Sequence, residues 1–444
     1  MQMKSVLIAL ALLAAAAGRA AAQPGYVPAP ENIEARERFR DHRFGIFIHW
    51  GLYALLGDGE WAMHNKNIEC GEYARLADAF CPSRFSAREW ARAVREAGAG
   101  YLCFTSRHHD GFSLFDSDAS GYNSADATPF ARDAVGELAE ACREQGLDLH
   151  LYYSHLDWSR SDYWPLGRTG HGTGRTGGGE WDSYLGFMES QLTELLTRYG
   201  PIGAIWFDGY WDRDEEPGGL EPERWNLYGQ YELIHRLQPA CLIGNNHHMN
   251  PFPGEDIQIF ERDIPGENLY GYSEQDIGTL PLETCQTMNR SWGYRITDTD
   301  YKSTEELIRY LVRTAGMDAN LLLNVGPRPD GSLPDQALER LRGMGRWLER
   351  YGESIRGTRG GVVAPHGWGV TTQRGNRLYV HVLDASDPRV FVPYGGNRLL
   401  SAVRMADGSA VRFTSTPEGV VLTLAGEPDP TDEIIVLTYK NEIE

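Results

Sequence analysis

The chain has 444 residues, of which 41% are hydrophobic and 23% charged, and its formal net charge is −20 at pH 7. This composition excludes a disordered or low-complexity chain, and the length favours a barrel of about 250 residues or more with a smaller partner domain. The negative charge disfavours binding to nucleic acid or to an anionic membrane and is typical of a protein that acts on neutral ligands.

The first residues predict an export signal. Lys4 supplies a basic start, residues 6–17 form an apolar core, and residues 20–22 form a cleavage site of small residues. The apolar run is too short for a membrane span, and no other segment reaches the ~18 apolar residues that a span requires. We therefore expect residues 1–22 to be a signal peptide and the protein to be exported, to the periplasm or the extracellular space.

Short apolar runs alternate with amphipathic segments over most of the chain. The runs expected as strands are 44–49, 101–105, 148–153, 204–208, 241–245, 257–261, 283–288 and 321–325. Continuous apolar runs of this length are typical of buried parallel strands. The segments expected as helices are 87–97, 134–145, 184–199, 224–237, 304–315 and 335–351. Eight strands with interleaved helices predict an α/β fold, a (β/α)8 TIM-like barrel over residues 23–357.

The barrel is expected to be irregular on one side. No clear helix joins the fifth strand to the sixth or the sixth to the seventh, and residues 246–300 are rich in Pro, Gly and Asn. This stretch is typical of long active-site loops. A glycine-rich stretch at residues 167–179 interrupts the third crossover and predicts a flexible loop near the barrel mouth.

The pattern changes after residue 357. Short alternating runs follow, separated by Gly, Asp and Pro, and they lie at 378–382, 390–392, 411–413, 420–424 and 434–437. This spacing predicts that residues 358–444 form a C-terminal antiparallel β-sandwich.

The six cysteines match neither the CxxC pairs of metal sites nor a dense disulfide scaffold. Cys103, Cys241 and Cys285 lie in apolar runs, where a free thiol behaves as a small core residue. A bridge between Cys70 and Cys81 would be compatible with export.

Polar and aromatic residues follow the expected strands at their carboxyl ends, which meet at one opening in a barrel of this kind. In chain order they are His49, His108, His109, Tyr152, Tyr153, Trp206, Asp208, Asn245, Asn246, His247, His248 and Glu261. Aromatic rings stack on the C–H faces of sugars, and imidazoles and amides bind sugar hydroxyl groups, so this set predicts a sugar site. The loop residues Trp61 and Trp292 would be either walls of that site or core anchors.

Two carboxylates are the expected catalytic groups. Asp208 closes an apolar run beside two aromatic residues, and a buried carboxylate needs a compensating role. We interpret it as one of the carboxylates of glycoside hydrolysis, the alternative being an aspartate that orients a histidine or caps the next segment. The candidates for the second carboxylate are Glu255, Glu261 and Glu267. Glu261 is favoured because it ends the sixth strand, although an ion pair with Arg262 would make it a surface residue.

The adjacent residues His108 and His109 show neither the HxH spacing of a strand nor the HExxH pattern of a helical zinc site. Hydrogen bonding to a sugar is the favoured interpretation, with Asp110 fixing a ring, and a metal site is the alternative. We expect no metal ion and no organic cofactor.

Six motifs resemble the α-L-fucosidases of glycoside hydrolase family 29. They occur in the order of the family, at residues 43–51, 60–61, 105–112, 152–154, 206–209 and 320–327. The resemblance implies a retaining mechanism in which the aspartate of the Trp-x-Asp-Gly motif, here Asp208, is the nucleophile. It also implies a set of fucose-binding residues, namely His49, Glu60, Trp61, His108, His109, Tyr153 and Trp206.

The acid/base residue of the family has no fixed motif. Asp256 followed five residues later by Glu261 loosely matches the Asp-x-x-Thr-x-Glu pattern of the family, with Ile259 in place of threonine, and this match favours Glu261. A family arginine after the fifth strand has no counterpart, and His247 would take its place.

The expected reaction is a double displacement that releases terminal α-L-fucosyl residues from fucosylated oligosaccharides or glycoconjugates. Ionised Asp208 attacks the anomeric carbon while protonated Glu261 gives its proton to the leaving oxygen, and water then cleaves the fucosyl-enzyme. Burial and the charge of Asp208 are expected to keep Glu261 protonated near neutral pH.

Three other functions stay open at this point. The same scaffold would serve another exo-glycosidase, of the galactoside type, since a fold does not fix the substrate. A metal-dependent hydrolase would use the histidines, and a non-catalytic carbohydrate-binding protein would use the same pocket without turnover.

Overall fold

The computed structural model describes residues 25–165, 167–175 and 177–443, and the expected signal peptide at residues 1–22 lies outside these ranges. The larger part is a sheet of eight parallel strands in the order β5-β4-β3-β2-β1-β8-β7-β6. Its outer strands meet at one parallel bridge between Gly244 and Ile257, so the sheet is a nearly closed barrel, as predicted. The strands are β1 (Phe44–Ile48), β2 (Tyr101–Arg107), β3 (Asp148–Ser154), β4 (Ala204–Asp208), β5 (Leu242–Asn245), β6 (Gln258–Glu261), β7 (Leu282–Thr287) and β8 (Ala319–Val325).

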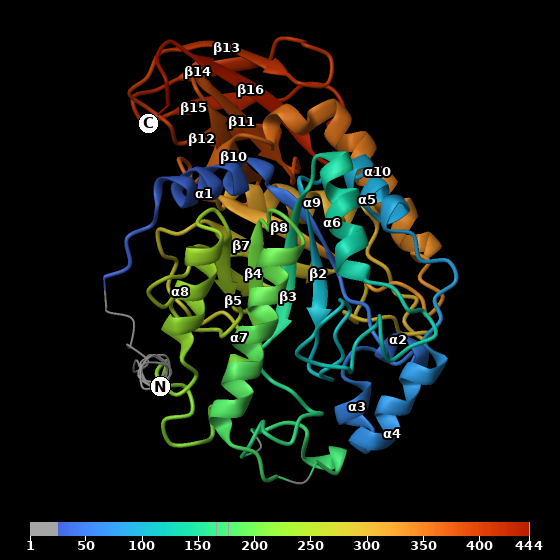
Figure 1. Cartoon of the computed structure of the whole chain (residues 1–444). Helices are drawn as coiled ribbons and strands as arrows, with labels where there is room; N and C mark the ends of the chain where they lie inside the picture. Colours follow the sequence, from blue (N-terminus) through green and yellow to red (C-terminus); the bar gives the residue numbers. More distant parts are fainter. Residues whose placement is uncertain (1–24, 166, 176, 444) are drawn as a thin grey trace, which may run out of the picture.

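Helices cover the outside of the barrel (Figure 1). They are α5 (Ala87–Glu96), α6 (Ala134–Gln145), α7 (Trp181–Arg198), α8 (Leu227–Leu237), α9 (Thr304–Gly316) and α10 (Asp335–Tyr351). All six were predicted. Three of them, α5, α6 and α9, begin directly after a side chain that caps the first turn, namely Ser86, Asp133 and Ser303. Residues 246–257 and 262–281, which join β5 to β6 and β6 to β7, contain no helix, as expected.

Short helices lie in the loops. They are α2 (Tyr53–Leu56), α3 (Ala62–Asn65) and α4 (Cys70–Ala74), and the 3-10 helices η1 (Arg75–Ala79), η2 (His171–Thr173), η3 (Tyr210–Arg213) and η4 (Gly352–Ser354). All of these except η4 follow β1, β3 or β4, so they build the rim at the carboxyl ends of the strands.

Like the short helices of the loops, the longer helix α1 (Pro30–His42) was not predicted. Its sequence is mostly charged and only Asn32, Ala35 and Phe39 are buried, so it shows no continuous apolar stripe from which a helix could be inferred. Ala35 and Phe39 pack with residues of the barrel interior, and Asn320 of β8 donates a 2.6 Å hydrogen bond to the carbonyl of Phe39. The helix therefore closes the amino-terminal end of the barrel.

The alternation of side chains along the strands separates two apolar layers. On β4, Ile205 and Phe207 pack against the helices, whereas Ala204 and Trp206 lie inside the barrel. Asp208 follows Trp206 by two positions and therefore shares its inward direction, at the open end of the strand.

The C-terminal part consists of two antiparallel sheets, which form the predicted sandwich. One has the order β13-β16-β11-β10-β9 and the other the order β12-β15-β14. The strands are β9 (Arg359–Gly360), β10 (Gly369–Arg374), β11 (Arg377–Val382), β12 (Arg389–Val392), β13 (Leu399–Arg404), β14 (Arg412–Ser415), β15 (Val420–Thr423) and β16 (Glu433–Tyr439). Three of them, β9, β10 and β13, were not predicted, because they are short or lack clear alternation.

The larger sheet of the sandwich has two buried faces. One face joins the second sheet in a separate apolar core, whereas Val370, Tyr379 and Ile434 on the other face belong to the core of the barrel and its helices. The sandwich lies beyond one end of the barrel, and β2 and β3 point away from it (Figure 1). The carboxyl ends of the strands, where the predicted site residues lie, are therefore at the opposite end.

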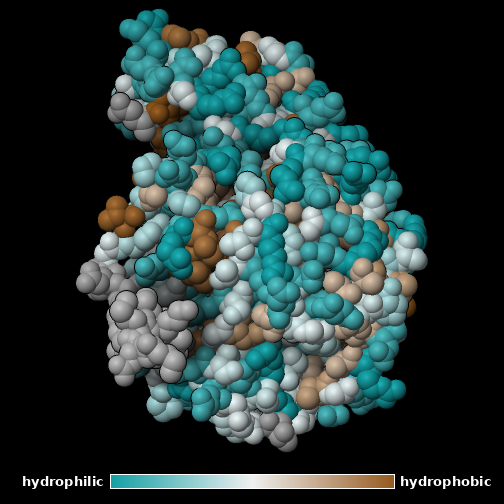
Figure 2. All heavy atoms as spheres, viewed as in Figure 1, coloured by the Kyte–Doolittle hydropathy of each residue, from teal (hydrophilic) through white to brown (hydrophobic). Residues whose placement is uncertain are grey.

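The surface shown in Figure 2 is mostly hydrophilic, with small separate apolar areas. Within the described ranges, no helix combines the length and the apolar character needed to cross a membrane. The six cysteines are free thiols, so the bridge considered between Cys70 and Cys81 is not formed.

Candidate active site

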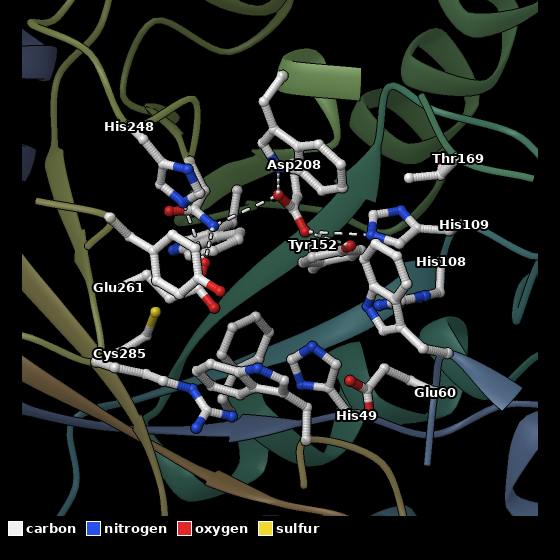
Figure 3. A pocket seen from close by; sticks show the side chains of 18 of the residues that line it. His49, Glu60, His108, His109, Tyr152, Thr169, Asp208, His248, Glu261 and Cys285 are labelled. Carbon is white, nitrogen blue, oxygen red and sulfur yellow. Dashed lines mark hydrogen bonds and ion pairs between the residues drawn. The ribbon is translucent and has the colours of Figure 1, made fainter. Parts of the chain in front are cut away.

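A cavity of about 580 Å³ opens at the carboxyl ends of the barrel strands. Its lining residues are Phe47, His49, Glu60, Trp61, His108, His109, Tyr152, Arg168, Thr169, Trp206, Asp208, Trp211, Asn246, His248, Glu261, Arg262, Tyr270, Tyr272, Cys285 and Trp292. Most of the residues singled out from the sequence are among them, and the two expected carboxylates face each other across the cavity (Figure 3).

Asp208 accepts hydrogen bonds from two aromatic side chains and lies next to a histidine. The hydroxyl of Tyr152 donates to its Oδ2 over 2.9 Å, the indole Nε1 of Trp211 donates to its Oδ1 over 3.0 Å, and the imidazole Nε2 of His109 lies 3.6 Å from Oδ2 (Figure 3). Burial raises the pKa of Asp208 and the charge of Glu261 adds to this rise, while the bonds from Trp211 and Tyr152 oppose it. The pKa of Asp208 lies above its ordinary value as a result.

The residue after Asp208 has to be glycine. Gly209 has a φ of +82°, in the left-handed region, and a Cβ atom at this position would lie 2.8 Å from the Cβ of Leu156. The turn at Gly209 leads directly into η3, which brings Trp211 back onto Asp208. The Trp-Phe-Asp-Gly motif therefore sets the inward direction of the carboxylate, and its glycine makes the turn that brings the donor Trp211 to it.

Glu261 ends β6 with its side chain directed into the barrel. Ile257 and Ile259, four and two positions earlier, pack inside the barrel, so Glu261 has the same phase. Its Oε2 atom accepts a 2.9 Å bond from the Nδ2 of Asn246 and lies 3.1 Å from the Nε2 of His248. Arg262 forms no ion pair with it within 4.0 Å, so the surface-pair alternative does not hold.

The expected protonation of Glu261 near neutral pH is wrong. Burial does raise the pKa of Glu261, but the hydrogen bond and charge of His248, the bond from Asn246 and the charge of Arg262 outweigh it. The pKa of Glu261 therefore lies below its ordinary value, whereas that of Asp208 lies above. The sequence argument failed because it did not include a histidine in contact with Glu261.

Asn246 links the two carboxylates. Its Nδ2 atom lies 3.4 Å from Oδ1 of Asp208 and 2.9 Å from Oε2 of Glu261. Because both distances start at one nitrogen atom, the two oxygens are at most about 6.3 Å apart, the sum of 3.4 and 2.9 Å. Inverting glycosidases separate their carboxyl groups by roughly 6.5–9.5 Å and retaining ones by about 5–5.5 Å. The observed limit is below the inverting range.

Three imidazoles form one wall of the cavity. His49 contacts Oδ1 of Asn324 through Nδ1 over 2.7 Å, and His109 contacts the hydroxyl of Ser154 through Nδ1 over 2.7 Å. The ring of His108 stacks on that of Tyr152 with centroids 5.2 Å apart. Burial lowers the pKa of His49 to about 3 and lowers the pKa of the other two. These rings are therefore neutral near pH 7 and are suited to bind hydroxyl groups.

Loop residues complete this wall. Burial raises the pKa of Glu60, whose carboxylate accepts a 2.7 Å bond from the backbone of Gly293, next to Trp292. Trp61 stacks on Trp211 with centroids 5.9 Å apart. Of the two sequence interpretations of Trp61 and Trp292, the structure favours the pocket walls, because both line the cavity.

Two residues that were predicted to bind the sugar, Tyr153 and His247, do not line the cavity. In each case the adjacent residue lines it instead. Tyr153 points to the outer face of β3, where its hydroxyl donates to Gln191 of α7 over 2.9 Å, and its neighbour Tyr152 faces inward instead. His247 is turned to Glu255 at 2.9 Å, and the following residue His248 lines the cavity.

The other acid/base candidates lie elsewhere. Glu255 is buried and accepts bonds from Tyr231 and His247, and Glu267 pairs with Arg313 on the surface. Neither carboxylate lines the cavity, so Glu261 is the one of the three candidates that does, together with Asp208 and Glu60. Among residues 25–165, 167–175 and 177–443, no group of three or more His, Cys, Asp or Glu side chains is arranged to hold a metal ion.

Several lining residues were missed from the sequence. Of the two tyrosines at the end of β3, strand alternation could have selected Tyr152 over Tyr153, because Tyr152 is two positions after His150, whose ring stacks on Tyr101 inside the barrel. The residues on loops carried no such signal, because tertiary contacts place them. Thr169, in the glycine-rich stretch expected near the barrel mouth, lines the cavity because its hydroxyl and backbone N–H donate to Asp212 over 2.5 and 3.0 Å.

Comparison with known proteins gives a consistent result. Residues 13–353 match the family model described as alpha-L-fucosidase. A putative alpha-L-fucosidase of Caenorhabditis elegans is 31% identical over 372 residues, which cover 75% of this chain and 70% of that protein. The structure of alpha-L-fucosidase isoenzyme 1 from Paenibacillus thiaminolyticus superimposes with a TM-score of 0.81 at 32% identity, over 93% of this chain and all of that one.

A further similar structure is a trapped covalent intermediate. It is a GH29 alpha-L-fucosidase from Bacteroides thetaiotaomicron in complex with 2-fluoro-fucosyl fluoride, obtained with a glutamate-to-glutamine mutant. It superimposes with a TM-score of 0.79 at 26% identity, over 95% of this chain and 99% of that one.

Proposed function

The chain belongs to the α-L-fucosidase family and is a glycoside hydrolase, and from this premise we propose that it is a retaining exo-α-L-fucosidase. In this proposal, Asp208 is the nucleophile and Glu261 is the general acid/base. The substrates are terminal α-L-fucosyl residues of oligosaccharides or glycoconjugates.

The observation that carries the proposal is the bridge formed by Asn246. One amide nitrogen contacts both carboxylates, which limits the distance between the two contacted oxygens to about 6.3 Å, the sum of 3.4 and 2.9 Å. This limit lies below the separation that inverting enzymes use to place an attacking water molecule beside one carboxylate. It supports direct attack by one carboxylate. The covalent intermediate of the similar Bacteroides enzyme supports the same mechanism.

In the first step, the ionised carboxylate of Asp208 attacks the anomeric carbon and the glycosidic bond breaks. The proton of Glu261 passes to the leaving oxygen, so the aglycone departs as a neutral alcohol. Tyr152 and Trp211 hold the carboxylate of Asp208 in place through its two oxygens.

In the second step, Glu261 removes a proton from a water molecule, whose oxygen attacks the anomeric carbon and releases Asp208. Fucose leaves with its original anomeric configuration after two inversions. The two carboxyl groups share one proton in the reactive form, and the contact with His248 disfavours that proton on Glu261. The pH profile should therefore follow the coupled titration of the pair.

The three neutral imidazoles and the carboxylate of Glu60 are the proposed hydroxyl-binding groups, and Trp206, Trp61 and Trp292 supply apolar walls. Apolar walls suit a sugar that carries a methyl group at the position where a galactoside carries a hydroxymethyl group. Hydrolysis of an aryl α-L-fucoside and of an aryl β-D-galactoside should be compared. Turnover confined to the galactoside would overturn the substrate assignment.

Trapping with 2-fluoro-fucosyl fluoride tests the nucleophile. The fluorine at C2 slows the second step, so the fucosyl-enzyme accumulates, and peptide mass spectrometry should locate one 2-fluoro-fucosyl group on Asp208. Asp208→Asn should give no labelled peptide. A label on Glu261 or on Asp212, the buried carboxylate nearby in η3, would contradict the proposal.

We also propose that the protein is exported, because residues 1–22 have the pattern of a cleavable signal. Expression in a bacterial host with fractionation should give a mature chain that starts at Gln23 outside the cytoplasm. An intact Met1 in the cytoplasmic fraction would contradict this.

A further inference from the structure

Exposed apolar side chains gather in the loop between β6 and β7, residues 262–281. Leu269 is 79% exposed, Tyr270 49% and Tyr272 45%, and Ile277 is exposed as well. The two tyrosines line the cavity, whereas Leu269 and Ile277 do not. Apolar groups that stay exposed at the edge of a cavity mark a binding surface more often than groups scattered over a convex surface.

The loop is held in a defined shape by its own polar residues. The buried carboxylate of Asp263 accepts the backbone N–H groups of Leu269 and Tyr270 over 2.9 and 3.3 Å. The side chain of Asn268 accepts the N–H of Ser273 over 3.0 Å. Asp263 follows Glu261 by two residues, so the position of Tyr270 is tied to the strand end that carries the acid/base. A preorganised aromatic surface loses little entropy when a ligand binds.

Tyr272 connects this surface to the reacting groups. Its ring stacks on that of His248 with centroids 5.2 Å apart and an interplanar angle of 27°. His248 in turn contacts Glu261 at 3.1 Å (Figure 3). Because Glu261 protonates the leaving oxygen in the proposed mechanism, the sugar attached to that oxygen lies on the side of His248 and Tyr272.

Arg262 adds a positive charge at the same place. Its guanidinium carbon lies 5.3 Å from the ring centroid of Trp292 and 5.8 Å from that of Tyr270, and one N–H group donates to the carbonyl of Arg290 over 3.1 Å. Within the described part of the chain, no carboxylate lies within 4.0 Å of it. The other arginine of the cavity, Arg168, is paired with Asp214 at 2.6 Å.

Arg262 lines the cavity, and its charge there is not neutralised by an ion pair with a described residue within 4.0 Å. Its planar guanidinium retains donors for a second ligand, and such donors match the oxygens of a sulfate ester or a carboxylate. Stacking on two aromatic rings holds the group in place without neutralising it.

From these observations we propose that residues 262–281 form a subsite for the leaving-group sugar, in which Tyr270 and Tyr272 stack on the pyranose ring and Arg262 binds an anionic substituent. The inference rests on the proposed function, because it takes the position of the leaving oxygen from Glu261. It adds a substrate class: fucosides whose neighbouring sugar carries a sulfate ester or a carboxylate.

The test compares three kinds of substrate with the full-length enzyme. An aryl α-L-fucoside reports the fucose site alone. A fucosyl disaccharide with a neutral leaving sugar reports stacking, and the same disaccharide with a sulfate or a carboxylate on that sugar reports the charge contact. For each enzyme, kcat/KM on the disaccharides is expressed relative to that on the aryl fucoside.

Wild-type enzyme should prefer each anionic disaccharide to the neutral one by about tenfold, as expected for one charge-assisted hydrogen-bond contact. Arg262→Gln should remove this preference, and Tyr270→Ala should lower the relative kcat/KM on all disaccharides by about fivefold or more. The matched controls are Arg295→Gln, an exposed arginine outside the cavity, and Leu400→Ala, an exposed apolar residue on β13 of the C-terminal sandwich. Both should keep the wild-type ratios.

The outcomes separate the two proposals. No turnover of the aryl fucoside by wild type contradicts the proposed function. With that turnover intact, equal wild-type rates on neutral and anionic disaccharides overturn the role of Arg262, and an unchanged ratio in Tyr270→Ala overturns the stacking surface. A preference for the sulfate alone or for both anions supports the subsite and identifies which anion it takes.

Discussion

Two of the clusters in which a histidine contacts a buried carboxylate differ in one respect, because one opens to a cavity and the other does not. At the barrel mouth, Asp208 and Glu261 contact His109 and His248 beside a cavity of about 580 Å³. Between the barrel and the sandwich, His381 contacts Asp432 at 2.7 Å through Nδ1 and the hydroxyl of Thr372 at 3.2 Å through Nε2.

The second cluster has the order hydroxyl–histidine–aspartate, which in an open site would indicate a nucleophile. Here all three side chains are buried, and the hydroxyl of Thr372 donates to the carbonyl of Ser354 over 2.5 Å. The cluster therefore ties β10, β11 and the segment before β16 to the end of the barrel. Comparison of the two regions shows that the types of residue and the distances between them do not identify an active site by themselves. A cavity for a ligand must also adjoin the residues.

The largest expected difference between the two regions concerns catalysis. Glu261→Gln should lower kcat/KM by about 10²–10⁴ on a substrate with a poor leaving group, because the departing oxygen is no longer protonated. The loss should be smaller on an aryl fucoside with an activated leaving group. Steady-state kinetics on both substrates measure this, and an equal loss on both would contradict the role of Glu261 as acid.

Glu283, a carboxylate buried inside the barrel, should affect the stability of the fold rather than the reaction. Glu283 of β7 accepts hydrogen bonds from Tyr101 and Trp206 inside the barrel, and burial raises its pKa to about 7. Because the pKa of Glu283 is higher in the folded than in the unfolded protein, protonation of Glu283 stabilises the fold. This stabilisation is complete at pH values below the ordinary pKa of glutamate and is lost as the pH rises through about 7.

The isosteric change Glu283→Gln tests this. Relative to Glu283→Gln, the wild type should lose up to about 3 kcal/mol of unfolding free energy between pH 4.5 and 7.5, since one pKa unit corresponds to about 1.4 kcal/mol. Urea denaturation at several pH values measures both curves. Parallel curves would show that Glu283 keeps its ordinary pKa.

The buried cluster of Thr372, His381 and Asp432 gives the next prediction. Asp432→Asn leaves the buried His381 without its charged partner and should destabilise the fold by about 1–3 kcal/mol. The value of kcat should stay within about twofold of wild type, because the change is at the end of the barrel away from the cavity. Thermal denaturation and fucoside kinetics on the same sample provide both readouts. A large loss of kcat in folded protein would mean that the two regions are coupled.

The smallest expected effect is a change in the shape of the pH profile. His248→Phe removes the contact that lowers the pKa of Glu261, so that pKa should rise and the alkaline limb of kcat/KM should move to higher pH. Less negative charge on Glu261 also lowers the pKa of Asp208, which moves the acid limb to lower pH. The profile should therefore become wider, and a shift of both limbs in one direction would contradict this coupling.

The sequence was sufficient for the barrel, because buried parallel strands are continuous apolar runs. All eight were found within two residues of their bounds, and Asp208 and Glu261 were placed by their positions at strand ends. The motif alone did not fix strand phase, so Tyr153 and His247 were each chosen in place of a neighbour that faces the cavity. The outer half of the cavity was not predictable, because Tyr270 and Thr169 are positioned by loop hydrogen bonds to Asp263 and Asp212 that have no periodic signal in the sequence.

The most direct test of the central claim is rescue of Asp208→Gly. Without the nucleophile, turnover of an aryl α-L-fucoside should fall by about 10³-fold or more. Azide is small enough to enter the space left by the carboxylate and should restore part of the rate, with formation of a fucosyl azide of inverted anomeric configuration. A variant that keeps wild-type turnover without azide, or one that forms no fucosyl azide while correctly folded, would show that Asp208 is not the nucleophile.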